Sequence, residues 1–198
     1  MKILALELSS ARGSLAWRDG EIDLACEWPN DRKNSASFFE NLAALRKKFG
    51  LPETIVVGLG PGSYAGTRIA ISAAIGLQVA SGAKLLGYPS ICAIDSDVYC
   101  AVGDARRNSF FFAVIRDHNL VEGPDLFTED ELRAKLDERQ MSIFASEKLP
   151  QFDKVELRYP SAAILAKLAS ETDRDFARPP LEPMYLREPH ITEPRRSI

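Results

Sequence analysis

Four glycines between residues 58 and 66 constrain the fold of this chain more than any other stretch of its sequence. They follow a short apolar run, residues 55–57, of the kind found in buried central strands. After them, residues 67–81 carry only two long polar side chains, Arg68 and Gln78, which predicts a largely buried helix. A strand, a glycine-rich turn and a helix N-terminus suggest an anion site, because the first amides of a helix have no partners within it.

This glycine loop has three candidate explanations, and the sequence bears on each of them. Residues 60–65 match a dinucleotide-binding pattern, but the next strand is followed by Tyr88 rather than by an acid that could bind a ribose, and the nearest acid is Asp95. A Walker-type phosphate loop would need a lysine before Thr67, and none is present. The third explanation is structural: the glycines allow a tight turn from strand to helix.

The chain before the glycine loop reads as an antiparallel meander followed by a helix. Strands are predicted at residues 2–8, 13–17 and 22–28, and Asp19-Gly20 is a strong hairpin signal between the last two. Apolar residues then recur at helical spacing from an N-cap at Ser35 to Gly50. After the glycine loop and its helix we expect a strand at 84–87 and a short helix at 89–94.

The same pattern starts again at Val98. Residues 98–104 form a predicted strand that ends in Asp104, as the first strand ends in Glu7, and a second strand follows at 110–115. The repetition predicts an α/β fold of two lobes, the first at 1–96 with the glycine loop and the second at 97–198. Three further elements are expected: a helix opened by a capping box at Thr128, a strand at 141–145, and a helix to about residue 170 with Pro160 in its first turn.

From about residue 178 the chain is rich in proline, and we expect an extended tail that Tyr185 and Leu186 pin to the body. The formal net charge of −3 gives no general signature of nucleic-acid binding. Three cysteines without a CxxC pair are typical of reduced thiols in a cytosolic protein. No apolar run is long enough to span a membrane, and the N-terminus lacks a signal-peptide pattern. A cytoplasmic protein is therefore expected.

The strand-end acids Glu7 and Asp104 are the weak candidates for cofactor binding. Nucleotide-binding sugar-kinase and actin-like folds hold a metal–phosphate between two such hairpins, so a small ATPase or phosphotransferase that uses both acids with magnesium is one possible function. The two histidines, His118 and His190, are far apart in sequence, so neither a histidine metal site nor Ser–His or Cys–His catalysis is predicted. The paired arginines at 106–107 and 195–196 are expected to be solvated.

Four segments resemble the TsaB (YeaZ) family of bacterial tRNA threonylcarbamoyladenosine biosynthesis proteins. They are residues 2–9, the Gly-Leu-Gly-Pro-Gly-Ser-Tyr-Ala-Gly-Thr-Arg-Ile core at 58–69, residues 101–106 and residues 182–187. The resemblance runs in order over nearly the whole chain. It implies a two-lobed actin-like ATPase (ASKHA, ribonuclease H-like) fold and a non-catalytic paralogue of TsaD, the subunit that transfers threonylcarbamoyl to the adenosine 3′ of the anticodon in tRNA.

The resemblance also implies the partners of the chain. They are TsaD, in a heterodimer, and the ATPase TsaE; tRNA would be reached only through the complex, and the isolated chain would form a homodimer. The family implies no cofactor of its own, with ATP and a metal bound by the partner proteins. Members have also been labelled glycoproteases, but this sequence has neither a metal-ligand set nor a nucleophile–base pair.

Three departures from the family and its catalytic relative bear on function. Ser90 and Ile94 stand where TsaD carries two metal-binding histidines, so no metal site is expected here. Glu7-Leu8 replaces the usual Asp-Thr after the first strand, which removes a phosphate-facing hydroxyl. The second lobe is also shorter than is usual in the family.

The helix at 67–81 is the predicted partner surface, because a helix that is apolar all round must be covered all round. One side can pack on its own sheet, and the other needs a second cover, either another protein or the helix at 35–49. Docking on TsaD, or on a second copy, would agree with the resemblance. The predicted interface consists of Tyr64, Thr67, Arg68, Ile71, Ala74, Ile75 and Gln78.

Overall fold

A computed structural model describes residues 1–20, 22–30, 35–171 and 174–187, and its centre is a pair of five-stranded sheets. In the first sheet, β1 pairs antiparallel with β2 and β2 with β3, while β4 and β5 extend the sheet parallel to β1. The strand order is β3-β2-β1-β4-β5. The strands are β1 (Ile3–Glu7), β2 (Arg12–Asp19), β3 (Ile22–Pro29), β4 (Thr54–Gly58) and β5 (Lys84–Tyr88).

The second sheet repeats this arrangement, with the order β10-β9-β6-β7-β8. Here β6, β7 and β8 form the antiparallel meander, and β9 and β10 run parallel to β6. The repeat seen in the sequence is therefore present in the topology, and the fold is the predicted two-lobed ASKHA-type α/β fold. The strands are β6 (Val98–Asp104), β7 (Phe110–Arg116), β8 (Asn119–Phe127), β9 (Ile143–Ala145) and β10 (Val155–Leu157).

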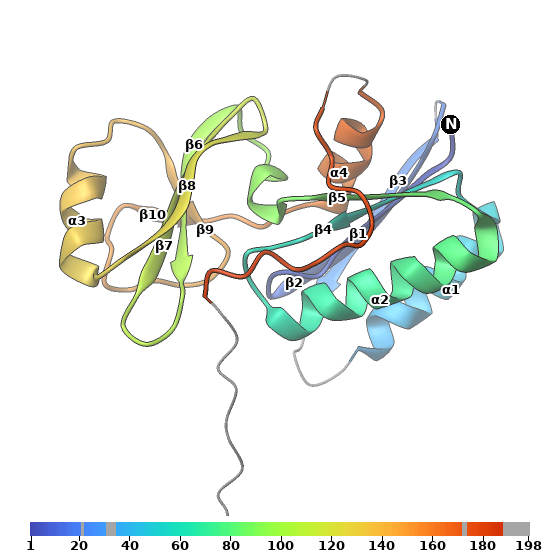
Figure 1. Cartoon of the computed structure of the whole chain (residues 1–198), viewed down its shortest axis with the longest axis horizontal. Helices are drawn as coiled ribbons and strands as arrows, with labels where there is room; N and C mark the ends of the chain where they lie inside the picture. The colour runs from blue at the N-terminus through green and yellow to red at the C-terminus, as the bar shows by residue number, and fades with distance from the viewer. Residues whose placement is uncertain (21, 31–34, 172–173, 188–198) are drawn as a thin grey trace, which may run out of the picture.

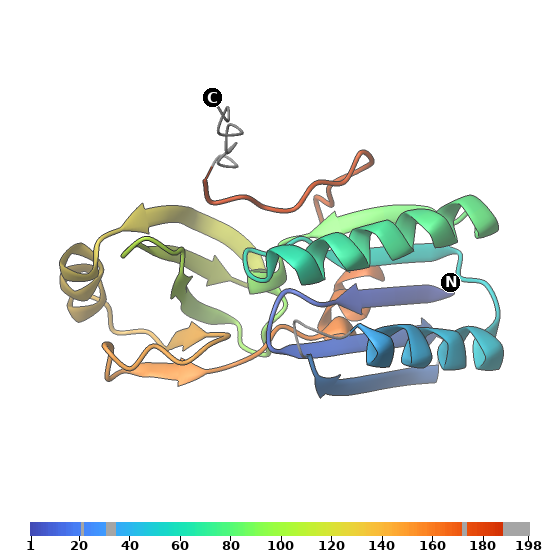
Figure 2. The same ribbon diagram turned by 90° about the horizontal axis from the view of Figure 1, so that it is seen from below.

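Helices cover both faces of the first sheet. Figures 1 and 2 show α1 and α2 side by side on one face and α4 on the opposite face. α3 packs on β7 and β8 of the second sheet, and the 3-10 turn η1 follows β5. The helical segments are α1 (Ala36–Phe49), α2 (Tyr64–Ser81), η1 (Ser90–Cys92), α3 (Glu129–Asp137) and α4 (Ala162–Ala169).

β1 is buried on both faces, as expected of a central strand between two helical layers. Leu4 and Leu6 belong to the apolar cluster under α1 and α2. Ile3 and Ala5 point the other way, into a cluster that includes α4 and also apolar residues of the second lobe. A third cluster lies between the second sheet and α3. One of the three cores is thus shared by the two lobes.

The chain returns to the first lobe after β10, which differs from the predicted assignment of residues 97–198 to the second. α4 packs on β1, β2 and β4, and its Ala162 N–H donates to the buried Ser14 Oγ of β2 over 2.9 Å. Further along, Ala177 pairs with Gly87 at the edge strand β5. The second lobe therefore comprises β6 to β10 with α3, and the C-terminal segment completes the first lobe.

Several predicted element ends differ from the structure. α2 begins at Tyr64, because the Ser63 side chain caps it by accepting a hydrogen bond from the Gly66 N–H. α4 is capped by Ser161 rather than started by Pro160. β8 and β10 were not predicted, whereas the capping box at Thr128 is confirmed, with both of its hydrogen bonds formed.

No helix in the described ranges is both long enough and apolar enough to cross a lipid bilayer.

The two glycines inside α2 are predicted to respond in opposite ways to alanine. A Cβ at Gly66 would collide with the carbonyl oxygen of Leu8, whereas a Cβ at Gly76 would meet nothing within 4 Å. Gly66→Ala should lower the free energy of unfolding by about 1–3 kcal/mol, the usual effect of overpacking. Gly76→Ala should raise it by about 0.5–1 kcal/mol, because alanine loses less backbone entropy in a helix. Urea denaturation of both variants measures this, and equal effects would contradict the packing described.

Candidate functional site

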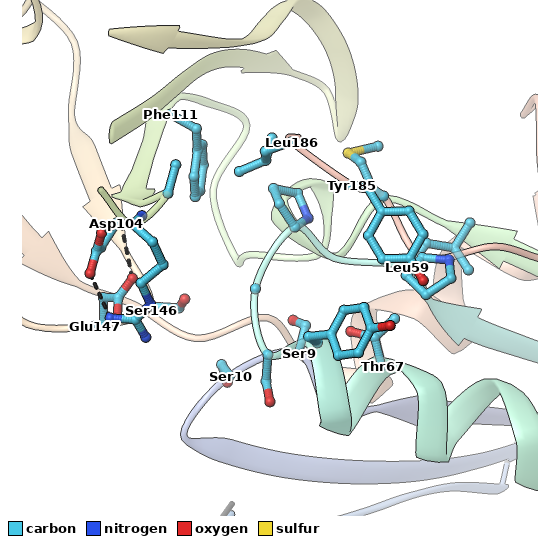
Figure 3. A pocket seen from close by; sticks show the side chains of 18 of the residues that line it. Ser9, Ser10, Leu59, Thr67, Asp104, Phe111, Ser146, Glu147, Tyr185 and Leu186 are labelled. Carbon is cyan, nitrogen blue, oxygen red and sulfur yellow. Dashed lines mark hydrogen bonds and ion pairs between the residues drawn. The ribbon is translucent and has the colours of Figure 1, made fainter. Parts of the chain in front are cut away.

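A cleft of about 480 Å³ lies between the two lobes. It is formed by the turns that follow β1 and β6, the glycine loop with the start of α2, the segment after β9, and the C-terminal segment (Figure 3). Its polar lining includes hydroxyl groups, two arginines and two acids. These are Ser9, Ser10, Thr67, Tyr64, Tyr185, Ser146, Arg106, Arg187, Asp104 and Glu147.

The glycine loop rests directly on the turn after β1. The Ser63 N–H donates to the carbonyl oxygen of Ser9 over 2.6 Å, and a Cβ at Gly62 would collide with that same oxygen. The Ser63 hydroxyl in turn accepts from the Gly66 N–H, 3.2 Å away. Two of the amides that could bind an anion are thus engaged within the chain, and the geometry favours the structural explanation of the glycines.

Asp104 lies in the cleft as predicted, but its carboxylate is already engaged. Oδ1 accepts from the backbone N–H of Arg106 over 2.6 Å, and Oδ2 pairs with the Arg106 guanidinium over 2.7 Å. The Asp104 N–H donates to Glu147 Oε1 over 3.0 Å, which ties the segment after β9 to the end of β6 (Figure 3). No local sequence pattern points to Glu147, because it lies 43 residues further along the chain than Asp104.

Glu7 does not line the cleft, so the predicted pairing of Glu7 with Asp104 across it is wrong. The Glu7 side chain is fully buried beneath Gly58, where any Cβ would overlap the carboxyl group. Its Oε1 accepts from the Ser9 N–H over 2.6 Å. Burial raises the pKa of the Glu7 carboxyl, and hydrogen bonding with Ser9 and Ser90 opposes this without cancelling it.

Ser90 links this buried acid to the glycine loop. The Ser90 Oγ accepts from the Gly60 N–H over 2.9 Å, and the Ser90 N–H donates to the Gly60 carbonyl over 2.7 Å. Ser90 thus holds the glycine loop by two hydrogen bonds. Ile94, four residues further on, is buried in the shared apolar core.

The C-terminal segment closes one side of the cleft. The Met184 N–H donates to the Leu59 carbonyl over 2.7 Å, and the buried Leu181 side chain packs near Gly87. The Tyr185 ring packs on Tyr64, with ring centroids 5.6 Å apart, and Leu186 packs against the shared core. Tyr185 and Leu186 therefore pin the tail as predicted. His190 and the arginines at 195–196 lie outside the described residues.

The structure divides the predicted interface residues of α2 into two groups. Thr67, Ile71 and Ala74 are only 2%, 6% and 0% exposed, because they pack on the chain's own first sheet, so their assignment to the partner surface is wrong. The exposed members are Tyr64, Arg68 and Ile75, while Gln78 is half-buried. Periodicity separates the faces of a helix but does not say which one meets the sheet.

The outer side of α2 forms an exposed stripe, which we define as Tyr64, Arg68, Ser72, Ile75 and Val79. Ile75 is 43% and Val79 is 83% exposed. α1 packs on β2 beside α2 and leaves this stripe uncovered, so the alternative in which the helix at 35–49 covers it is wrong. At the first turn, the Arg68 guanidinium lies 5.0 Å from the centroid of the Tyr64 ring and donates to its hydroxyl.

Metal-ligating side chains are scattered over the described part of the chain, and no three His, Cys, Asp or Glu residues gather there as a possible metal site. The Nδ1 of His118 lies 2.9 Å from the carbonyl oxygen of Cys92. Cys92 and Cys100 are buried free thiols, and burial raises the pKa of Cys92 to about 12. A thiol with so high a pKa is a poor nucleophile at neutral pH.

Comparison with solved structures places the fold among YeaZ proteins. An uncharacterized protein with similarity to peptidase YeaZ from Pseudomonas aeruginosa superposes with a TM-score of 0.74, at 20% sequence identity over 94% of this chain and 99% of that chain. YeaZ from Pseudomonas aeruginosa gives a TM-score of 0.69, at 20% identity over 85% and 91% of the two chains. No protein-family model and no curated protein matches the sequence. The chain therefore has the YeaZ fold over nearly its whole length.

The buried carboxyl of Glu7 predicts a pH-dependent stability. Since its pKa is raised on folding, the neutral acid stabilises the protein fully below the unfolded pKa of about 4.3, and this contribution is lost as the pH rises through the folded value. Glu7→Gln, a neutral isostere, should therefore gain stability relative to the wild type as the pH rises from about 4. Urea denaturation across the pH range measures the difference.

Glu40→Gln, at an exposed position of α1, is the matched control and should follow the wild-type curve. Two results would contradict the burial of a titrating acid at Glu7. One is a difference in unfolding free energy between Glu7→Gln and the wild type that stays constant with pH, and the other is a Glu7→Gln variant that loses stability relative to the wild type as the pH rises.

Proposed function

We propose that this chain is a TsaB (YeaZ)-type subunit, a non-enzymatic scaffold and activator of a TsaD-containing complex that modifies tRNA. Three features support the proposal. The fold is that of YeaZ from Pseudomonas aeruginosa, the four sequence segments resemble the TsaB family, and α2 presents an exposed apolar stripe. In this role TsaD transfers threonylcarbamoyl to the adenosine 3′ of the anticodon, and this chain supports TsaD.

The exposed stripe of α2 is the observation that carries the proposal. An isoleucine and a valine on one helix face remain open to solvent although the other face of the same helix packs on the first sheet. Around them stand small residues, Ser72, Gly76 and Ala80, which let the backbone of a second helix approach closely. Contiguous apolar surface of this kind marks protein–protein contact sites. The stripe therefore suits a helix of TsaD, or of a second copy when TsaD is absent.

The geometry favours a scaffold over the alternative, an ATPase or phosphotransferase that uses Glu7 and Asp104 with magnesium. That mechanism needs both carboxylates to face the cleft, where oxygen ligands could reach a hard cation. Glu7 is enclosed beneath Gly58, and Asp104 is paired with Arg106. Neither acid is therefore placed to share a metal–phosphate, and ATP and the metal are assigned to the partner proteins.

The remaining parts of the proposal follow from this role. The chain acts in the cytoplasm, where tRNA is modified, and TsaE joins the complex that it forms with TsaD. With a net charge of −3 the chain alone should bind tRNA weakly, so tRNA is reached through the complex.

Substitution in the stripe should separate binding from folding. Ile75→Glu or Val79→Glu would place an unpaired carboxylate in the interface, so binding to TsaD should weaken by at least about 30-fold, the size of a hot-spot loss of roughly 2 kcal/mol. Circular dichroism should show an intact fold, because both side chains are solvent-exposed in the free chain. Size-exclusion chromatography with TsaD from the same cells measures the loss of the complex.

Two matched variants make this result specific. Leu157→Glu changes an exposed apolar side chain of β10, on the other lobe, and should leave both fold and complex intact. Ile71→Glu alters the buried face of α2 and should unfold the chain. Normal binding by both Ile75→Glu and Val79→Glu would remove the stripe from the interface.

A further inference from the structure

The turn between β7 and β8 bridges from the second lobe to the first. Asp117 and His118 form this turn, both with positive φ angles of 49° and 61°. Tyr88, at the end of β5 in the first lobe, donates from its hydroxyl to the carbonyl oxygen of His118 over 2.8 Å. The same hydroxyl lies 3.3 Å from Asn119 Oδ1. Figure 1 shows this turn of the second lobe directed towards η1.

The same turn also contacts the connection between the lobes. His118 Nδ1 lies 2.9 Å from the carbonyl oxygen of Cys92 in η1. Since a carbonyl can only accept, Nδ1 carries the proton of this hydrogen bond. The Asp117 N–H donates to the carbonyl of Asp97 over 2.6 Å, in the segment that leads from η1 into β6.

Arg174 contacts the turn from a third direction, the segment that follows α4. Its Nη1 donates to the Asp117 carbonyl over 3.0 Å and lies 3.4 Å from Asn119 Oδ1. Its Nε pairs with the Glu171 carboxylate. Segments from three distant parts of the sequence thus meet at one turn. We define the interlobe junction as Tyr88, Cys92, Asp117, His118, Asn119 and Arg174.

Apolar packing continues from this junction into the core that the lobes share. The Tyr88 ring packs on Phe176, with centroids 4.9 Å apart. Tyr99 of β6 is fully buried, and its hydroxyl donates to the Ile91 carbonyl of η1 over 2.5 Å. Phe111 of β7 and Leu165 of α4 belong to the same cluster. A rotation that separated the lobes would expose this apolar surface and leave buried polar groups unpaired, and both changes are unfavourable.

None of the junction residues lines the cleft. Two-lobed proteins often close around their ligands by hinge motion at a few connecting residues. Here the connecting residues are held by hydrogen bonds outside the cleft. We propose that the interlobe junction locks the two lobes in one orientation, so that the cleft keeps a single shape and does not open and close as a hinge.

The lock can be tested with spin labels on the two lobes, whatever the partner of the chain is. Ala43 on α1 and Ala134 on α3 are exposed and can each be replaced by cysteine for labelling. Of the native cysteines only the partly exposed Cys26 needs to be changed, to serine, because Cys92 and Cys100 are buried. Double electron–electron resonance should give one narrow distance distribution for the otherwise wild-type chain. Added ATP with magnesium should not shift it.

Tyr88→Phe combined with Arg174→Met removes the side-chain hydrogen bonds that these two residues make at the junction, and it keeps the ring and the aliphatic stem. This variant should roughly double the width of the distance distribution, or add a second distance, because the lobes gain hinge freedom. Tyr185→Phe with Arg107→Met makes the same chemical changes outside the junction and should leave the distribution narrow. The single variant Arg174→Met, at a partly exposed position, covers the case in which the double variant is unstable.

A wild-type chain with a broad or two-peaked distribution would overturn the proposal. So would a folded junction variant, double or single, with a distribution as narrow as that of the wild type.

Discussion

The close backbone contact between the glycine loop and the turn after β1 is the constraint on which the rest of the structure depends. Gly62 and Gly66 lie against the carbonyl oxygens of Ser9 and Leu8, where no side chain fits. This contact draws the start of α2 onto β1, so one face of α2 is buried on the first sheet from Gly66 to Ala74. Once that face is fixed, the opposite face of an almost wholly apolar helix must lie outward, which is where Ile75 and Val79 are found.

The same contact determines what the interlobe cleft can do. The hydrogen bond from Ser63 to Ser9 and the cap of Ser63 on Gly66 use groups that could otherwise bind an anion. Glu7, which in this topology ends the first strand beside the cleft, is sealed beneath Gly58 as an acid of raised pKa. The fold thus retains the two lobes and the cleft of its class, while its most distinctive exposed feature is a helix surface. That combination fits a binding subunit better than a phosphotransferase.

The sequence predicted those elements that depend on residues close together in the chain. The apolar strands β1, β4 and β6, the repeat of the meander and the capping box at Thr128 all follow from short-range patterns and are confirmed. β8 was missed because Gly123-Pro124 interrupts its pattern, and β10 because it is short and largely exposed. Contacts across more than 25 residues of sequence are not encoded in any local pattern. Such contacts determine the placement of α4 on the first sheet, the burial of Glu7 and the interlobe junction. The buried face of α2 was assigned wrongly for a related reason: periodicity gives the faces of the helix but not the position of the sheet.

In the function proposed above, this chain acts through the outer surface of α2. Hydrogen–deuterium exchange of the whole chain, alone and bound to TsaD, can show whether it does, because the method reports every backbone segment without altering any side chain. Peptides covering residues 64–81 should exchange more slowly in the complex, while those covering β8 and β10 should be unchanged. Slower exchange confined to the second lobe, with residues 64–81 unaffected, would contradict the proposal.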